Sequence, residues 1–293
     1  MAEATPPSTF CSISFESVGA ALDWGADQLR RAGIDNPRLE ARLIAAHTAG
    51  LSPTELIARR GDPFPAEPFA GLVGRRANHV PLAHLTGVRE FWSLPFHVSP
   101  ATLIPRPESE SVVAAALRRL PQVAPARVLD LGTGTGCLLL AVLSERPAAF
   151  GIGLDRVPAA AALAARNARD LGLSDRAAFL CGNWGDPIDG RFALVLSNPP
   201  YIPAAELDAL MPEVSRYEPA SALDGGTEGL DAYVRIIADL PRLLAPGGVA
   251  VLELGPALGF AGLARAAGFA IEIEPDLAGA PRVAICSLPG SHT

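Results

Sequence analysis

The most specific chemistry in this sequence lies in four consecutive residues, Asn198-Pro199-Pro200-Tyr201, which follow an apolar segment over residues 192–197. Two prolines fix the backbone and remove two N–H donors, so the carbonyl groups of the run are free to accept hydrogen bonds. The side-chain oxygen of Asn198 and the carbonyl oxygen of Pro199 can hold both N–H groups of a planar amide or aromatic amine. Tyr201 can pack on the face of that group. We therefore predict that Asn198, Pro199 and Tyr201 are catalytic and that all four residues bind the substrate.

Methylation is the reaction that this arrangement favours. The lone pair of an amide or aromatic amine is delocalised, so its nitrogen is a weak nucleophile and gains from being held against a methyl donor. Positioning of this kind can lower the barrier by several kcal/mol without a strong base. In the alternative interpretation, Pro199 and Pro200 only close a loop after a strand. That alternative is disfavoured because a cofactor-type loop precedes the run in the chain.

A glycine-rich loop, Gly132-Thr133-Gly134-Thr135-Gly136, lies between an apolar segment and a helical one. Glycines let the backbone turn sharply and approach a ligand closely, and the helix that follows presents free N–H groups to it. Nicotinamide-dependent and P-loop proteins also use such loops. Here Cys137 replaces the third glycine of the dinucleotide fingerprint and no Gly-Lys-Ser/Thr follows, so both of those classes are disfavoured.

Two further residues extend the predicted cofactor site. Asp155 ends the second apolar strand, 19 residues after Gly136, where a carboxylate can accept hydrogen bonds from both ribose hydroxyls of an adenosine cofactor. The alternative is that Asp155 only caps the next helix. Trp184 follows the third strand and can stack against or wall an adenine ring, although an isolated tryptophan more often belongs to a core.

Strands that alternate with helices after residue 126 are expected to position these groups. The pattern predicts a doubly wound α/β domain with a mostly parallel seven-stranded sheet, helices on both faces and ligands at the carboxyl ends of the strands. Helices are expected to end near residues 120 and 145, and further helices to span 157–171, 230–244 and 256–267. The expected strands are 128–131, 150–154, 177–181, 192–197, 249–254, 269–274 and 282–287.

The first part of the chain has a different pattern. Apolar residues recur at helical spacing between glycine and proline breaks, so we expect a small bundle of four or five helices after a loose tail over residues 1–15. Aromatic and β-branched residues then mix with turn formers over residues 84–98, which suggests a β-hairpin. The expected domains are a helical domain at 1–83, a hairpin linker at 84–106 and the α/β domain at 107–293.

Composition and charge limit the classes of function. Apolar residues make up 49% of the 293 residues, which supports a packed core, and the thiols of Cys137, Cys181 and Cys286 are expected to be buried in it. The net charge is −7 and no basic run occurs, which disfavours a protein that acts along nucleic acid. Because no secretory signal, membrane span or metal-ligand spacing is recognised, we expect a soluble cytoplasmic protein that binds no metal. We expect a monomer because no long apolar surface helix requires a partner.

Longer stretches of the sequence resemble the HemK/PrmC family, the peptide chain release factor glutamine methyltransferases, over roughly residues 17–288. The Asn-Pro-Pro-Tyr run is common to amino methyltransferases, whereas four other stretches resemble this family in particular. They are Pro81-Leu-Ala-His-Leu-Thr-Gly87, Arg89-Glu-Phe-Trp92, Val98-Ser-Pro-Ala-Thr-Leu-Ile-Pro-Arg-Pro-Glu108 and Glu218-Pro-Ala-Ser-Ala-Leu-Asp-Gly-Gly226. The resemblance implies methyl transfer from S-adenosylmethionine, leaving S-adenosylhomocysteine, to the side-chain N5 of the glutamine in the Gly-Gly-Gln motif of class-1 release factors. This reaction would modulate translation termination.

The resemblance also implies roles for particular residues. Residues 198–201 would hold the glutamine, the helical domain would help to hold the release factor, and Arg106 and Glu108 would shape the site. Asn183 stands where many relatives are expected to carry Asp, which affects the fine contacts to the adenine. By position, the residues that would contact S-adenosylmethionine are Gly132, Thr133, Gly134, Thr135, Gly136, Asp155, Trp184 and Asn198.

Three alternatives stay open on the sequence. A sister family that methylates a glutamine of a ribosomal protein shares the Asn-Pro-Pro-Tyr run, but it resembles this chain less at Pro105–Glu108. An adenine-N6 DNA methyltransferase would need a basic groove and usually a separate recognition domain. A non-catalytic binding module on the same fold is disfavoured because the glycine loop, Asp155 and Asn198 are intact.

Overall fold

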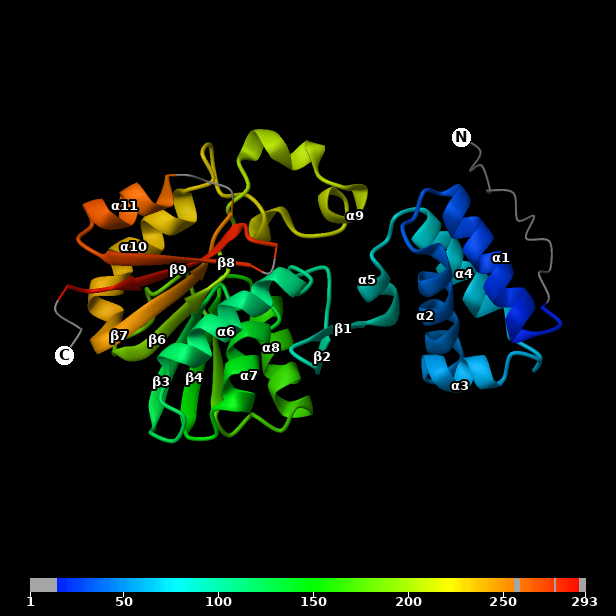
Figure 1. Ribbon diagram of the computed structural model, residues 1–293, viewed down its shortest axis with the longest axis horizontal. Coiled ribbons are helices and arrows are strands. Elements are labelled where there is room, and N and C mark those ends of the chain that lie inside the picture. The colour runs from blue at the N-terminus through cyan, green and yellow to red at the C-terminus, as the bar shows by residue number, and fades with distance from the viewer. Residues whose placement is uncertain (1–14, 256–258, 277, 290–293) are drawn as a thin grey trace, which may run out of the picture. The chain divides into compact units, whose positions relative to one another are not determined.

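The computed structural model describes residues 15–255, 259–276 and 278–289, and the chain divides between Thr86 and Gly87 into two compact units (Figure 1). The first unit is helical, and the second consists of a β-hairpin and an α/β sheet. The tail expected at residues 1–15 lies outside the described residues, except for Phe15. No helix in the described ranges is long and apolar enough to cross a membrane.

The helical unit owes its boundaries to local capping. Ser17 caps the first helix by accepting a hydrogen bond from a first-turn N–H, and Ser52 and Glu55 form a capping box at the third. Phe69 is fully buried in the core and meets the ring of Phe64 edge-on at 5.3 Å between centroids. The helices in the described part of this unit are α1 (Val18–Arg31), α2 (Pro37–Ala49), α3 (Pro53–Ala58), α4 (Ala66–Ala77) and α5 (Leu82–Thr86).

One sheet forms the frame of the second unit, in the order β5-β4-β3-β6-β7-β9-β8. Its parallel strands are β3 (Ala126–Leu131), β4 (Ala149–Asp155), β5 (Ala177–Cys181), β6 (Phe192–Ser197) and β7 (Leu244–Glu253). The strand β9 (Pro281–Ser287) is antiparallel to β7 and to β8 (Ala270–Pro275). The strand order reverses at β3, because β4 and β5 lie on one side of it and β6 and β7 on the other (Figure 1). The predicted fold class, a mostly parallel seven-stranded sheet, is confirmed.

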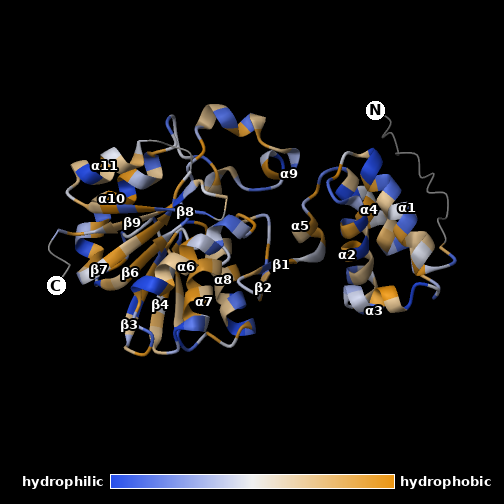
Figure 2. Cartoon of the chain, in the orientation of Figure 1, coloured by the Kyte–Doolittle hydropathy of each residue, from blue (hydrophilic) through white to orange (hydrophobic). Residues whose placement is uncertain are grey.

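Helices cover both faces of this sheet, and each face has its own hydrophobic core (Figures 1 and 2). The helices α6 (Glu110–Arg119), α7 (Cys137–Glu145) and α8 (Pro158–Asp170) share one core with Val128 of β3. The helices α10 (Asp231–Leu243) and α11 (Phe260–Ala266) share the other core with Leu129, the next residue of the same strand. Successive side chains of a strand point to opposite faces, so a sheet covered on both sides needs apolar residues at nearly every position.

A buried amide side chain, that of Asn167, joins the hairpin to the sheet domain. Its strands β1 (Val88–Phe91) and β2 (Leu94–His97) turn at Trp92 and Ser93, whose φ angles are 53° and 58°. The side chain of Asn167 in α8 accepts a hydrogen bond from the N–H of His97 at 2.9 Å and donates to the carbonyl groups of His97 and Thr135, at 3.1 and 2.9 Å. Asn167 thereby holds the hairpin and the glycine loop together.

Three expectations from the sequence were wrong in detail. Residues 84–86 belong to helix α5 and not to the hairpin segment, because Leu85 is buried in the helical core and its N–H donates to the carbonyl of Pro81. Strand β7 begins at Leu244, five residues earlier than expected, and Leu244 pairs with Phe192 across a register shift. Cys181 is exposed, because β5 is an edge strand of the sheet.

The chain between β6 and α10 forms short helical turns that the sequence did not predict. They are η2 (Ala204–Ala209), α9 (Pro212–Ser215) and η3 (Ala220–Ala222). A further turn, η1 (Pro107–Ser109), precedes α6. Parts of these connections border a cavity at the carboxyl ends of the parallel strands.

Candidate active site

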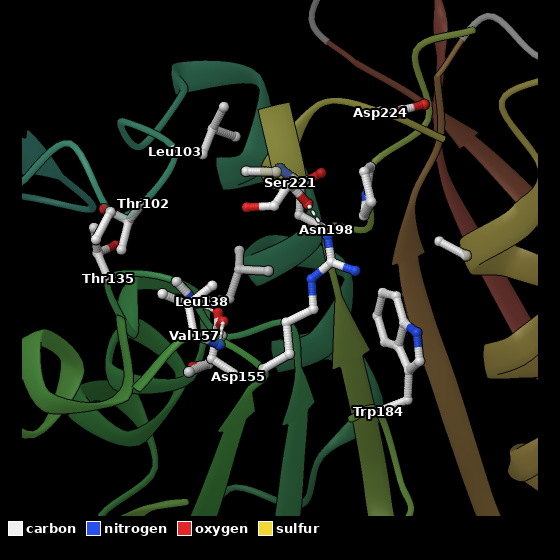
Figure 3. A pocket seen from close by; sticks show the side chains of 18 of the residues that line it. Thr102, Leu103, Thr135, Leu138, Asp155, Val157, Trp184, Asn198, Ser221 and Asp224 are labelled. Carbon is white, nitrogen blue, oxygen red and sulfur yellow. Dashed lines mark hydrogen bonds between the residues drawn. The ribbon is translucent and has the colours of Figure 1, made fainter. Parts of the chain in front are cut away.

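A cavity of about 540 Å³ lies at the carboxyl ends of β3, β4 and β6 (Figure 3). This is the point where the strand order reverses, at which open α/β sheets bind their ligands. The volume lies within the range of small-molecule and cofactor sites. The predicted site residues in its wall are Gly132, Thr133, Gly134, Thr135, Asp155, Trp184, Asn198 and Pro200, whereas Gly136, Pro199 and Tyr201 lie outside it.

The glycine loop at the end of β3 is shaped by left-handed backbone conformations. Gly132 and Gly136 have φ angles of 72° and 82°, which residues with a Cβ rarely adopt. The N–H of Thr133 donates to the carbonyl of Leu154 at 2.8 Å, so the loop is joined to β4. A Cβ on Gly136 would lie 3.1 Å from the Cβ of Ala164. Gly136 therefore lets α7 and α8 pack closely and does not face the cavity.

Asp155, at the end of β4, both supports the loop and lines the cavity. Its Oδ2 accepts a hydrogen bond from the N–H of Gly134 at 2.9 Å, and its Oδ1 accepts one from the N–H of Val157 at 2.9 Å. Each carboxylate oxygen has a further lone pair. Asp155 can therefore accept hydroxyl groups of a ligand while it holds the glycine loop and the start of α8.

Asp130, the last polar residue before the glycine loop, was not predicted as a site residue. It is 1% exposed. Burial, and to a smaller extent repulsion from Asp155, raises its pKa to about 7, although the hydrogen bond from Thr133 lowers it. The hydroxyl of Thr133 donates to its Oδ2 at 2.6 Å, while its Oδ1 has no hydrogen-bond partner among the described residues. The sequence signal was the acidic residue at the end of a buried strand, two residues before the first glycine.

Trp184 stands in the cavity wall with a φ of 48°, a left-handed conformation for a bulky residue (Figure 3). A Cβ on Gly132 would lie 3.6 Å from its ring, so the indole lies against the glycine loop. The neighbouring Asn183 is exposed and its amide donates to Asp186 at 3.5 Å. The indole is therefore placed to border a planar ligand bound beside the loop.

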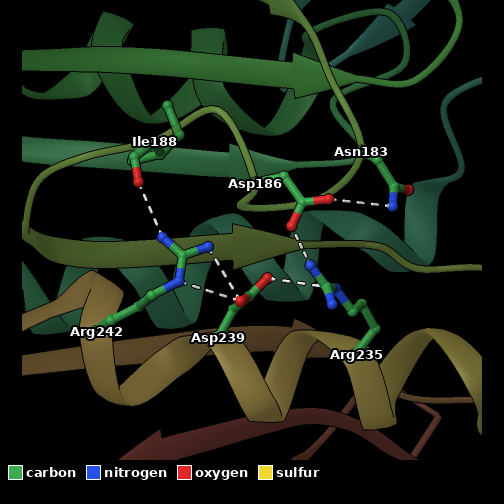
Figure 4. Close-up of polar contacts among 6 residues, drawn as sticks. All are labelled: Asn183, Asp186, Ile188, Arg235, Asp239 and Arg242. Atoms are coloured by element: carbon green, nitrogen blue, oxygen red, sulfur yellow. Dashed lines mark hydrogen bonds and ion pairs between the residues drawn. The ribbon is translucent and has the colours of Figure 1, made fainter.

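A chain of ion pairs fastens the loop of Trp184 to α10 (Figure 4). Asp186 pairs with Arg235, which also approaches Asp239 at 3.6 Å. Arg242 pairs with Asp239 at 3.0 Å and donates to the carbonyl of Ile188 at 2.9 Å. Two positions of the loop after Trp184, Asp186 and Ile188, are thus held by side chains of one helix.

The Asn198–Tyr201 element follows β6 at the edge of the cavity, and both of its ends are hydrogen-bonded to other elements. The amide of Asn198 donates from Nδ2 to the Oγ of Ser109 at 3.2 Å. The hydroxyl of Tyr201 donates to Glu253 at 3.4 Å, and a Cβ on Gly255 would lie 2.2 Å from the tyrosine ring. Tyr201 therefore packs against the end of β7, and only part of the expected contact surface for a substrate faces the cavity in this structure.

Two connections that border the cavity are tied to each other by Glu218. Its side chain accepts a hydrogen bond from the N–H of Ile104 at 3.0 Å and pairs with Arg106. Arg106 lines the cavity, whereas Glu108 is exposed and does not. Two other residues of the cavity wall are also bonded to each other, because Arg156 donates to the carbonyl of Ser221 at 3.3 Å. These bonds link β4 and the segment before α6 to the chain that follows the Asn198–Tyr201 element.

Comparison with known proteins assigns the chain to a family. The pattern of the PrmC N-terminal domain matches residues 20–87, and that of a methyltransferase domain matches residues 123–254. The chain is 45% identical over 271 residues to the release factor glutamine methyltransferase of Rhodospirillum rubrum, covering 90% of this chain and 83% of the relative. The chain belongs to the release factor glutamine methyltransferase family. The family's enzyme from Escherichia coli is 43% identical over 225 residues, covering 75% of this chain and 80% of that one.

Solved structures confirm the fold of the family's methyltransferase part. A methyltransferase from Pyrococcus furiosus covers 73% of this chain and 96% of its own, with a TM-score of 0.51 and 16% identity. The 16S rRNA N2 G1207 methyltransferase of T. thermophilus, solved with AdoMet and guanosine, covers 69% of this chain and 49% of its own. Its TM-score is 0.52 and its identity 21%. At these identities the likeness concerns the fold alone.

Some residues that border or support the cavity were not predicted from the sequence. Arg156 follows Asp155 directly, so its place after a site residue was a usable signal. Ser109 and Glu253 are each 2% exposed and hydrogen-bonded to each other. Ser109 follows the Pro105–Glu108 stretch that carries the resemblance, whereas nothing in the sequence marks Glu253 except its position at the end of a strand.

Proposed function

We propose that this protein transfers a methyl group from S-adenosylmethionine to the side-chain amide nitrogen of the glutamine in the Gly-Gly-Gln motif of class-1 peptide chain release factors. The observation that carries the proposal is the placement of Asn198 in the wall of the cavity that also holds the glycine loop and Asp155. It is supported by 45% identity to a release factor glutamine methyltransferase. From its sequence we expect the enzyme to act as a cytoplasmic monomer on protein and not on DNA.

The residues that line the cavity suit S-adenosylmethionine chemically, and the cavity volume of about 540 Å³ is typical of a small-molecule site. Gly132 and Gly134 leave room for the ligand beside the start of α7, and the Asp155 carboxylate can accept the ribose hydroxyls. Trp184 can border the adenine, and its loop is fixed to α10. When bound, the cofactor supplies a methyl group on a positively charged sulfur, which makes it a strong alkylating agent.

The substrate amide would be held by acceptors only. Asn198 Oδ1 and the Pro199 carbonyl would accept its two N–H bonds and so orient the nitrogen towards the bound methyl donor. Methyl transfer would replace the S–C bond of the donor by an N–C bond, one N–H proton would leave to water, and a secondary amide would remain. Burial, followed by the nearby charge of Glu253, raises the pKa of Tyr201 to about 12, so its hydroxyl stays protonated and does not act as a base. Positioning therefore carries the catalysis.

Mass spectrometry of the substrate tests the proposal directly. A purified class-1 release factor, incubated with the enzyme and S-adenosylmethionine, should gain the mass of one methyl group on the glutamine of its Gly-Gly-Gln peptide. The Asn198→Ala variant should keep its circular dichroism spectrum and give no added mass. Label on a ribosomal protein or on DNA, with an unmodified release factor, would select the sister family or the DNA methyltransferase instead.

A further inference from the structure

A buried polar pair lies directly beneath the Asn198–Tyr201 element. Ser109 comes from the turn η1 and Glu253 from the end of β7, 144 residues apart in the chain, and each is 2% exposed. The hydroxyl of Ser109 donates to Oε2 of Glu253. Buried polar groups are costly unless they are hydrogen-bonded, so the stability of this pair depends on its hydrogen bonds.

Both ends of the Asn198–Tyr201 element are bonded to this pair. Asn198 donates from Nδ2 to Ser109 Oγ at 3.2 Å, and Tyr201 donates from its hydroxyl to Glu253 Oε1 at 3.4 Å. One oxygen of the Glu253 carboxylate is thus bonded directly to Tyr201, and the other is connected to Asn198 through the Ser109 hydroxyl. The ring of bonds links β6, η1 and β7.

The direction of these bonds determines which way the Asn198 amide points. An ionised carboxylate can only accept, so the hydroxyl hydrogen of Ser109 must point to Glu253. The Ser109 oxygen then has only lone pairs left, so its partner must be a donor, which in Asn198 is the NH2 group. The oxygen and nitrogen of an amide are told apart by such networks. Oδ1 is therefore left as the end of the amide that is available to a ligand in the cavity.

We propose that Ser109 and Glu253 are positioning residues that orient the amide of Asn198, so that its oxygen and not its nitrogen meets the N–H groups of the substrate. This inference rests on the proposed function. A flipped Asn198 would present its NH2 to the NH2 of the substrate, two donors that cannot bond to each other, and the nitrogen would lose its alignment. Neither residue touches the reacting atoms.

Glu253 must be ionised for this arrangement, and its surroundings act on that charge in both directions. Burial raises its pKa, while the bond from Ser109, the charge of Arg282 and the bond from Tyr201 lower it. A protonated Glu253 could donate to Ser109, which would free the serine to donate to Asn198 and reverse the amide. The titratable or charged groups that act on Glu253 or feel its charge are Glu108, Cys137, Tyr201, Tyr233 and Arg282.

Methylation kinetics on a release factor test the role of the serine. Ser109→Ala should lower kcat by about 10- to 100-fold while KM for S-adenosylmethionine stays within about threefold of wild type. Ser109→Thr, which restores the hydroxyl, should recover kcat to within about fivefold of wild type. Ser144→Ala is the matched control, because its hydroxyl donates to the Ala141 carbonyl within α7, and it should leave kcat unchanged. A Ser109→Ala enzyme as fast as the control would overturn the inference, as would a threonine variant as slow as the alanine variant.

The pH profile and the Asn198 amide signals distinguish orientation from a merely structural role. Wild-type kcat should fall as the pH drops through the raised pKa of Glu253, and Glu253→Gln should be slow at every pH without this acidic limb. In NMR spectra of the 15N-labelled enzyme, the side-chain NH2 of Asn198, assigned by its absence in Asn198→Asp, should show a hydrogen-bond shift that Ser109→Ala removes. This measurement needs no substrate. An unshifted wild-type NH2 would refute the orientation, whereas a shifted NH2 in an enzyme that leaves release factors unmodified would refute only the proposed function.

Discussion

The carboxylate of Asp155 at the end of β4 accepts a hydrogen bond from the backbone N–H of Gly134 at 2.9 Å. The side chain proposed to bind the ribose therefore also sets the shape of the glycine loop. Its other oxygen is bonded to the N–H of Val157, so the carboxylate is fixed on both sides before any ligand arrives. A site that is ordered in advance loses less conformational freedom on binding.

Asp155→Asn should weaken cofactor binding strongly. The substitution keeps one oxygen acceptor but removes the charge and replaces the second oxygen by a donor, which would face the N–H of Val157 or of Gly134. Charge-assisted bonds contribute roughly 1.5–3 kcal/mol, so Kd for S-adenosylhomocysteine should rise about 10- to 100-fold in calorimetric titrations. Asp175→Asn, at an exposed position, is the control and should bind as wild type does. An unchanged Kd in Asp155→Asn would remove this residue from the cofactor site.

Arg242→Gln should loosen the loop that carries Trp184. The variant loses the ion pair with Asp239 and the bond to the Ile188 carbonyl (Figure 4). Because the Arg242 side chain is 43% exposed, solvent screens the pair and the effect should be moderate, with Kd for S-adenosylhomocysteine about three- to tenfold higher. Arg265→Gln, at the end of α11, is the control. Equal affinities in the two variants would show that the chain of ion pairs does not support the site.

The fold could be predicted from the sequence because the central strands of the sheet, β3 and β6, are buried on both faces. Apolar patterns in the sequence gave six of the seven strands of the sheet within two residues of their observed bounds, and only β7 was misplaced by more than that at its start. Leu244 was read as the end of α10, since its apolar side chain fits a helix pattern and a strand equally well. The strand runs through Gly247 and Gly248, which interrupt the apolar run before residue 249.

The sequence predicted the candidate site only at residues that lie at the ends of strands. The glycine loop, Asp155 and Asn198 each end a strand, so their convergence at one edge of a parallel sheet follows from topology. Ser109 and Glu253 come from elements far apart in sequence, and their contact depends on how η1 packs over the end of β7. The burial of Tyr201 against Gly255 is likewise a result of tertiary packing that no local pattern encodes.

Glu218→Gln should destabilise the connections that border the cavity. The Glu218 side chain is 1% exposed and pairs with Arg106, while the glutamine could still accept the bond from the Ile104 N–H. Since Arg106 is 34% exposed and can be solvated, the free energy of unfolding should fall by about 1–3 kcal/mol, measured by urea denaturation. Glu274→Gln, which removes a surface pair with Arg118, is the control and should cost less than about 1 kcal/mol. Equal losses in both variants would mean that the buried pair has no special role.

Asp130→Asn should change how the stability of the cofactor-free protein depends on pH. The pKa of Asp130 is raised from 3.8 to about 7, chiefly by burial, so between these values the unfolded chain has lost the proton that the native state still binds. The native state is then favoured at low pH, and this contribution is lost as the pH rises towards 7. Asparagine carries no such proton and can still accept the bond from Thr133. Relative to wild type, the variant should therefore gain about 2–4 kcal/mol in free energy of unfolding between pH 4.5 and pH 8. Urea denaturation at both pH values measures this gain, with Asp175→Asn as the control. A difference between Asp130→Asn and wild type that is the same at both pH values would show that the buried carboxyl does not titrate in this range.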